Sequence, residues 1–269
     1  MSRGMGEGRC GEVAAGHPTL DTLARPLTTE AVVLRSFPFG EADRVLHLYS
    51  EAGGRIGAIA KGVRRTKSRF GGRLEPLSHV ELVLHRGRGE LYTVTGASLV
   101  HSHDRIRSDG PRLRVGLIGI EAMTRLFVEE ERSERAFLAI TRFLDALDEG
   151  PLRPGLRPGL EPLGLAFQLK LLWLSGFMPH LDGCVACGAK ARLVAFDPAA
   201  GGVVCVGCET GGIALSSDGL AGLSALLRSP LADAPSLGLT QGALREALAV
   251  VTGSYEHHAG FRLRTLRSS

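Results

Sequence analysis

The sequence predicts an α+β protein in which a small N-terminal β-barrel is followed by a helical domain that carries a four-cysteine zinc knuckle. Three observations lead to this prediction. Short apolar or alternating runs fill the N-terminal part, helical periodicity begins after Pro111, and two Cys-x-x-Cys pairs lie in the second half of the chain. A length of 269 residues accommodates two domains of about 100–200 residues each. We expect a tail over 1–27, a barrel domain over 28–104, and a helical domain over 105–269 with a zinc-binding insertion at about 181–212.

The bulk composition is typical of a folded protein without a membrane span. The chain is 44% hydrophobic and 22% charged, and no apolar run approaches the roughly 18 residues that a membrane helix needs. Residues 1–27 mix glycine and other small residues without periodicity, which favours a disordered tail, and they contain no apolar segment of the signal-peptide kind. We therefore expect a cytoplasmic protein. A net charge of +4 allows an anionic partner but does not require one.

Five strands are expected between Thr28 and His103. In this region glycine and proline separate apolar or alternating runs at 30–37, 43–50, 55–60, 78–86 and 90–99. Apolar residues of the fourth run recur with a period of two, and the glycines after Arg86 predict a hairpin turn into the fifth. Five strands in about 75 residues suit a small closed or partly open barrel, and an SH3-like barrel fits the same pattern.

The remainder of the chain is predicted to be mainly helical. Apolar residues recur at helical spacing over 113–127 and 137–147, and Gly150 follows where a left-handed cap is expected. The prolines of 150–162 predict a linker, after which a helix is expected from Leu163 to Ser175. Beyond the cysteines, two further helices are expected, one capped by Ser216 or Ser217 and bounded by Pro230, the other capped by Thr240.

The four cysteines, Cys184, Cys187, Cys205 and Cys208, are the strongest chemical signal. Two pairs separated by 17 residues match the two-knuckle spacing of a four-thiolate zinc site. Each pair can present both sulfurs to one tetrahedral ion at about 2.3 Å, and Gly188 and Gly207 are expected to relax the backbone there. Four thiolates fill the coordination shell, so one structural zinc ion is expected. Redox pairs or disulfides are the alternative, which a reducing cytoplasm disfavours.

A zinc-dependent nucleobase deaminase is a competing hypothesis, because His79-Val80-Glu81 fits the His-x-Glu half of that signature. Gly183 stands where the signature proline is needed, the second cysteine pair is left without a role, and His79 lies in a strand-like run. These features argue against it. Two other histidines, His101 and His103, stand at a strand end where they can hold a metal, but we expect ordinary surface histidines there.

A dense run of cations without an acid lies between the third and fourth strands. Over 61–73, which we call the cation loop, the basic residues are Lys61, Arg64, Arg65, Lys67, Arg69 and Arg73, and Arg86 and Arg88 follow at the next hairpin. Such a loop favours sequence-tolerant, salt-sensitive contacts with nucleic-acid phosphates, although a plain solvated loop has the same composition. Aromatic residues are sparse, so backbone contacts are expected rather than a base-stacking platform; the five present are Phe37, Phe39, Tyr49, Phe70 and Tyr92.

Motifs of nucleotide-driven and hydrolytic enzymes are missing from the sequence. It contains no G-x-x-x-x-G-K-[ST] phosphate loop and no convincing carboxylate cluster for a two-metal nuclease. We therefore expect a binding protein rather than an enzyme. An RNA-binding zinc protein of the translation or transcription machinery remains an alternative, and competition between DNA and RNA would separate the two.

Several segments together resemble the bacterial recombination mediator family RecO. The resemblance is carried by residues 29–35 (TEAVVLR), 40–44 (GEADR), 60–65 (AKGVRR), 67–72 (KSRFGG), 87–93 (GRGELYT), 176–179 (GFMP) and 181–184 (LDGC). It covers 28–103 densely and 163–210 loosely. Members of that family have an N-terminal OB barrel, a helical C-terminal part and, in many, a four-cysteine knuckle, so the resemblance implies this fold.

The same resemblance implies a function in recombinational DNA repair in the nucleoid. Its implied activities are binding of single- and double-stranded DNA, annealing of complementary strands, and loading of RecA onto single strands coated by the single-stranded DNA-binding protein. RecR is the implied partner, and RecF is a further candidate. The helical domain is implied to dock the acidic tail of the single-stranded DNA-binding protein, which we expect near the last helices and Arg262, Arg264 and Arg267.

Overall fold

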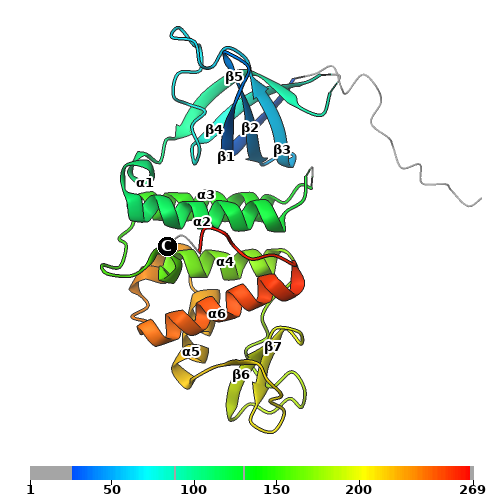
Figure 1. The fold of residues 1–269 in the computed structure, drawn as a ribbon, viewed down its shortest axis with the longest axis vertical. Helices are drawn as coiled ribbons and strands as arrows, with labels where there is room; N and C mark the ends of the chain where they lie inside the picture. Colours follow the sequence, from blue (N-terminus) through cyan, green and yellow to red (C-terminus); the bar gives the residue numbers. More distant parts are fainter. Residues whose placement is uncertain (1–25, 88, 130, 267–269) are drawn as a thin grey trace, which may run out of the picture.

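The computed structural model describes residues 26–87, 89–129 and 131–266. Three parts follow one another along the long axis of the molecule: a β-barrel, a group of helices, and a small sheet at the far end (Figure 1). The expected tail, up to residue 25, lies outside the described residues. The first strand already begins at Leu27.

The N-terminal part is a closed barrel of five strands, which confirms the predicted architecture. The strands are β1 (Leu27–Phe39), β2 (Asp43–Ser50), β3 (Gly54–Ala60), β4 (His79–Arg86) and β5 (Tyr92–His101), in the order β1-β2-β3-β5-β4. Neighbours pair antiparallel, except that β3 runs parallel to β5 and closes the barrel. The barrel is of the OB-like kind that the family resemblance implied.

Residues 31–34 of strand β1 are covered on both faces, which explains their continuous apolar run. Ala31 and Val33 point into the barrel core, whereas Val32 and Leu34 belong to the core shared with the helices. Successive side chains of a strand point to opposite faces, so a strand covered on both sides becomes apolar throughout. The barrel is thus fixed to the helical part through one of its outer faces.

The helical part contains α1 (Asp104–Ser108), α2 (Gly110–Leu126), α3 (Glu134–Glu149), α4 (Pro162–Leu174), α5 (Ser217–Arg228) and α6 (Gln241–His258), with 3-10 turns η2 (Pro158–Leu160) and η3 (Leu231–Ser236). Ser216 and Thr240 cap α5 and α6 as predicted, each accepting a backbone N–H with its side-chain oxygen. Helix α4 is buried on nearly all sides and packs against α2, α3, α5 and α6. A helix that is apolar all round is the central one.

The prediction of a left-handed cap at Gly150 is wrong. Its φ is −74°, which is an extended conformation that other residues adopt as well. Glycine is needed for another reason, because a Cβ built there would lie 2.6 Å from the carbonyl oxygen of Ala146. Close approach of the backbone to the end of α3, rather than backbone torsion, therefore selects this residue.

The linker over 150–162 buries one carboxyl group, that of Glu161. The residue is 3% exposed; one of its oxygens accepts a 3.3 Å hydrogen bond from the Arg153 N–H, while Oε1 has no partner among the described residues. Burial raises the pKa of Glu161 from 4.5 to about 7. The folded protein therefore favours the protonated form, because a charged carboxylate is costly to bury.

Glu161→Gln is expected to flatten the pH dependence of stability. With the folded pKa above the unfolded one, the stabilising effect of the proton is fully present below about pH 4.5 and is lost as pH rises through 7. Between pH 6 and 8 the wild-type free energy of unfolding should fall by about 1 kcal/mol more than that of the variant. Urea unfolding measures this, with the exposed Glu149→Gln as control. Equal slopes for wild type and Glu161→Gln would contradict the assignment.

Candidate functional site

The cation loop connects β3 to β4 and is anchored at several points. Phe70 and Leu74 are buried in the barrel core. The Gly62 N–H donates to Asp43 Oδ1 at 2.7 Å, and the Arg64 N–H donates to the Ala42 carbonyl at 2.9 Å. The loop is therefore tied both to the barrel interior and to the β1–β2 turn, while its basic side chains lie outside.

All six predicted cations of the loop are exposed. Within residues 26–87, 89–129 and 131–266 none of them forms an ion pair with a carboxylate. Their contacts are local: Arg73 Nη1 donates to the Arg69 and Phe70 carbonyls at 3.0 and 3.2 Å, and the Arg69 guanidinium lies 4.8 Å from the Phe70 ring centre. The positive charge of the loop is thus largely uncompensated, as a phosphate-binding surface requires.

Strand register places Arg86 at the same end of the barrel as the cation loop. Arg86 pairs with Tyr92, and Tyr92 pairs with Ala58, three residues before Lys61. The guanidinium of Arg86 donates to the Tyr92 hydroxyl at 3.2 Å and lies 5.4 Å from its ring centre. Arg88, the eighth predicted cation, lies outside the described residues. The barrel end that holds these groups is opposite the end that contacts the helices (Figure 1).

Two exposed aromatic rings lie at this same end of the barrel. The sequence did not predict that these two rings would be exposed. Phe37 is 43% exposed and Phe39 is 56% exposed. Both rings lie on the same face of β1 as Arg35, because every second residue of a strand points to the same side. Tyr49 and Phe70 are buried instead. The signal in the sequence is that Arg35, Phe37 and Phe39 are spaced two residues apart, as residues on one face of a strand are. They follow the register shift between Val33 and Arg35.

The four predicted cysteines come together at the far end of the molecule. Cys184 and Cys187 lie in the turn after α4, and Cys205 ends β7 (Gly202–Cys205), which pairs with β6 (Leu193–Asp197) and precedes Cys208. Their sulfurs all lie within 4.8 Å of one another, and those of Cys187 and Cys205 are 3.7 Å apart. Sulfurs 2.3 Å from a tetrahedral ion are separated by about 3.8 Å, so the arrangement fits one metal ion.

Backbone geometry and thiol chemistry both prepare this cluster for a cation. The N–H groups of Cys205, Cys187 and Ala186 lower the pKa of the Cys184 thiol to about 6. The neighbouring sulfurs of Cys187 and Cys205 raise the pKa of Cys208, because a further thiolate would be crowded against them. A dication held by the four sulfurs would remove that repulsion and allow all four thiols to ionise.

The turns of the knuckle agree only in part with the predicted role of glycine. Gly188 has a φ of 76°, in the left-handed region, as expected for a relaxed turn. Gly207 has no positive φ and no atom within 4 Å of an added Cβ, so neither left-handed torsion nor a close approach accounts for glycine at that position. The core around the site is small: it consists of cysteines with a few residues of β6, β7 and the segment between Cys184 and β6, so little apolar burial holds this unit together.

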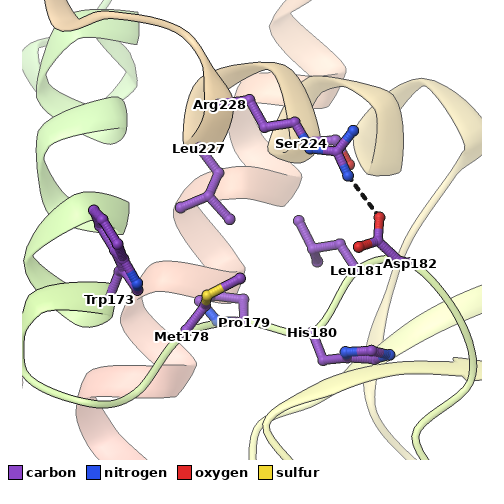
Figure 2. A pocket seen from close by; sticks show the side chains of 9 residues that line it. All are labelled: Trp173, Met178, Pro179, His180, Leu181, Asp182, Ser224, Leu227 and Arg228. Carbon is purple, nitrogen blue, oxygen red and sulfur yellow. Dashed lines mark hydrogen bonds and ion pairs between the residues drawn. The ribbon is translucent and has the colours of Figure 1, made fainter.

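An apolar groove with a cationic rim crosses the helical part. A cavity of about 830 Å³ lies between α3, α4 and the start of η3, and it adjoins a smaller one of about 270 Å³. Both are lined by Trp173, Leu227 and Arg228, and Figure 2 shows the smaller one with Trp173 facing Leu227 across it. The larger cavity is lined by four cations and two carboxylates, and one of the cations, Arg228, already pairs with Asp182 at 2.6 Å; these groups are Arg135, Arg142, Lys170, Arg228, Asp145 and Glu149.

The region near the C-terminus, where the sequence places the peptide pocket, has a smaller cavity of about 200 Å³. Arg262 there is paired with Glu256 at 2.7 Å, and the backbone N–H of Arg264 donates to Glu121 Oε1. Arg267 lies outside the described residues. The groove beside Trp173 is therefore a larger apolar surface than the cavity near the C-terminus. Trp173 is 48% exposed there.

The histidines singled out in the sequence have structural partners. His79 Nε2 donates to Glu30 Oε2 at 2.8 Å and the ring packs against Phe137, and within the described residues His79 belongs to no group of potential metal ligands. The zinc site of a deaminase needs a histidine beside its cysteines, and the cysteine group described here contains none, which argues against the deaminase hypothesis. The expectation of a surface histidine is wrong for His103, which is fully buried.

None of the helices described here has both the length and the apolar composition needed to cross a bilayer.

Comparison with known proteins gives consistent matches over most of the chain. Residues 25–103 match the family model described as recombination protein O N terminal, and residues 107–267 match that described as recombination protein O C terminal. The DNA repair protein RecO of Anaeromyxobacter sp. (strain K) is 36% identical over 243 residues, covering 88% of this chain and 92% of that protein. RecO of Frankia casuarinae is 39% identical over 240 residues, covering 88% and 95%. RecO of Rubrobacter xylanophilus is 39% identical over 184 residues, covering 68% and 71%.

Proposed function

The chain belongs to the recombination protein O (RecO) family of DNA repair proteins, and on this premise we propose that it anneals complementary strands and helps load RecA onto single-stranded DNA coated by the single-stranded DNA-binding protein. The observation that carries the proposal is the exposed cation loop, whose six described cations have no carboxylate partner in the described residues.

In this proposal annealing is a binding process without a catalytic residue. The cation loop and Arg86 hold phosphates of both strands, and each contact releases a condensed counterion. Lowering the repulsion between two polyanions on one surface raises the chance that complementary bases find register. The contacts are to the backbone, so they tolerate any sequence.

We propose that Phe37 and Phe39 add base stacking on the single strand. Phe39→Ala should weaken single-strand binding by about 1 kcal/mol, since base–aromatic stacking contributes about 1–3 kcal/mol per base. The salt dependence should not change, because no charge is removed. Fluorescence anisotropy with single-stranded and duplex oligonucleotides measures this, and Phe39→Trp serves as the matched variant that keeps a stacking surface. An equal loss with duplex would show that the ring supports the barrel rather than a base.

We propose zinc as the metal held by Cys184, Cys187, Cys205 and Cys208. Four thiolates at tetrahedral spacing suit zinc, which needs no open position in a structural site. When bound, the ion supplies cross-linking and no reaction chemistry. The chain's own contribution is to hold the thiolates with backbone N–H groups and to connect the β6–β7 hairpin to the helices.

The groove beside Trp173 is the proposed docking site for the acidic tail of the single-stranded DNA-binding protein. An apolar floor accepts an aromatic end of the peptide, and the rim cations suit its carboxylates. Lys170 is half-buried, with Nζ donating to the Leu227 carbonyl at 2.8 Å, and burial lowers its pKa. RecR and RecF are further proposed partners, for which no particular surface is assigned.

Binding of the tail peptide is the experiment that tests the mediator role. A fluorescein-labelled acidic peptide ending in phenylalanine should bind the wild-type chain and lose at least tenfold in affinity with Trp173→Ala, since a central aromatic residue of an interface commonly contributes about 2 kcal/mol or more. Val128→Ala, at an exposed apolar residue elsewhere, should bind normally. Binding of RNA in preference to DNA, together with no peptide binding, would favour the translation or transcription alternative.

A further inference from the structure

Four metal-ligating side chains gather where the barrel meets the helices. His101 ends β5, His103 lies in the connection to α1, and Asp145 and Asp148 lie on α3. Asp145 Oδ1 is 2.9 Å from His103 Nε2 and 3.1 Å from His101 Nδ1, and Asp148 Oδ2 is 3.9 Å from His101 Nε2. Ligand atoms of the first three all lie within 4.8 Å of one another.

The hydrogen bond from His103 to the Leu77 carbonyl fixes the tautomer of its neutral ring. Nδ1 lies 2.7 Å from the carbonyl oxygen of Leu77, and a carbonyl only accepts, so Nδ1 carries a proton. The lone pair of the neutral ring is then on Nε2, which faces the carboxylate of Asp145. Two electron pairs 2.9 Å apart repel unless a positive charge lies between them. A backbone carbonyl on the far nitrogen is the usual support of a metal-binding histidine.

The second histidine faces the same oxygen. The rings of His101 and His103 have centroids 4.2 Å apart and are tilted by 31°. One dication shared by both rings satisfies the two nitrogens and balances the two carboxylates. Asp148 is held in place by the Ile106 N–H, which donates to its Oδ1 at 2.9 Å.

The backbone supports the same conclusion. His103 has φ 52° and ψ 48°, in the left-handed region that non-glycine residues rarely adopt, and its side chain is fully buried. Such a conformation is strained in a residue that has a Cβ, and it persists where the surroundings impose it. It aims the ring between Leu77 and Asp145. The strain is therefore at the residue that presents Nε2 to the cluster.

We propose that His101 Nδ1, His103 Nε2 and the Asp145 carboxylate bind one divalent first-row transition ion, with Asp148 as an outer partner. Two imidazole nitrogens and one carboxylate oxygen suit zinc, cobalt or nickel. Ligands about 2.0–2.1 Å from a tetrahedral ion are about 3.3 Å apart, and the two separations from Asp145 Oδ1 to the histidine nitrogens, 2.9 and 3.1 Å, are close to that spacing. His101 is 34% exposed, which leaves one side open to solvent and to an exchangeable ion.

This second site would link strand β5 directly to helix α3. It goes beyond the proposed DNA annealing, because it fixes the position of the DNA-binding barrel on the partner-binding helices. Its donors are nitrogen and oxygen, whereas those of the knuckle are sulfur. The two sites can therefore be distinguished by spectroscopy in the same protein.

Cobalt titration of the full-length protein, purified with its knuckle loaded, tests the proposal. Wild type should take up one further equivalent of Co²⁺ whose absorption spectrum lacks the near-ultraviolet thiolate charge-transfer band. His101→Gln and Asp145→Asn, both at partly exposed residues, should each weaken that uptake at least tenfold, since loss of one ligand removes a large part of the site. His85→Gln, at an exposed strand histidine, should retain it.

Three results would overturn the proposal. One is the absence of a second equivalent in wild type, which would mean that protons alone occupy the cluster. Another is uptake that His101→Gln and Asp145→Asn leave unchanged. The third is a second equivalent whose spectrum shows thiolate ligation, which would place it at the knuckle. Far-ultraviolet circular dichroism confirms that each variant is folded.

Discussion

Cys205→Ser is expected to lose the metal ion and to unfold the C-terminal knuckle. Cys205 ends β7, is 8% exposed, and its sulfur lies 3.7 Å from that of Cys187. A serine oxygen does not replace a thiolate, so the remaining three ligands leave the shell incomplete. Apparent binding free energies of structural zinc are about 10–16 kcal/mol in small fingers, and for a unit with so small a core this is folding free energy.

The measurement has three parts. Metal analysis should find one zinc equivalent at the cysteines in wild type and none there in the variant. Limited proteolysis should cut the variant within 181–212 under conditions in which wild type is stable. Cys10→Ser, at the fifth cysteine, should behave as wild type. A wild-type protein free of zinc, or a variant that keeps it, would contradict the prediction.

The barrel should still bind DNA in the Cys205→Ser variant. The cysteines lie at one end of the molecule and the cation loop at the other, with the helices between them (Figure 1). DNA binding is therefore expected to persist while the C-terminal part loses order. If the variant lost DNA binding together with the order of the C-terminal part, the knuckle would support the whole fold.

Local signals in the sequence account for most of the elements. Alternation predicts β4, and the side chains of Ser216 and Thr240 predict two helix starts, because each depends on residues within a few positions. The cysteine site is predictable for a similar reason, since the Cys-x-x-Cys spacing itself makes the turn geometry. Closure of the barrel by parallel pairing of β3 with β5 depends on contacts between distant segments, and the family resemblance supplied the barrel type.

What the sequence leaves open depends on surroundings that no local pattern contains. Phe37 and Tyr49 are both aromatic strand residues, yet one is 43% exposed and the other is buried against the helices. His103 is buried only because α3 brings Asp145 to it. The groove beside Trp173 likewise needs α3, α4 and η3 together. Each of these features requires the packing of the two parts to be known.

The double variant Arg64→Ala/Arg65→Ala is expected to weaken DNA binding across all sequences. Both side chains are exposed at the barrel end, and Arg64 Nη1 donates a 3.3 Å hydrogen bond to the Gly40 carbonyl at the neighbouring turn. Near 0.1 M salt the affinity should fall roughly tenfold to fiftyfold, because fewer counterions are released on binding. The slope of log affinity against log salt should become shallower by about 0.7–0.9 for each phosphate that the variant no longer binds.

A charge-matched control separates local contacts from net charge. Arg245→Ala/Arg262→Ala removes the same two charges from exposed residues of the helical part, so general attraction of DNA falls equally in both variants. Only the cation-loop variant should make the salt slope shallower by the amount given above for each lost phosphate. Only that variant should also slow strand annealing, which is measured without nucleotide by the fluorescence of labelled complementary oligonucleotides. If both double variants lose affinity alike, the phosphates are attracted by overall basicity, and the cation loop is not the binding surface. A slope that changes with the loop variant alone assigns the phosphate contacts to Arg64 and Arg65.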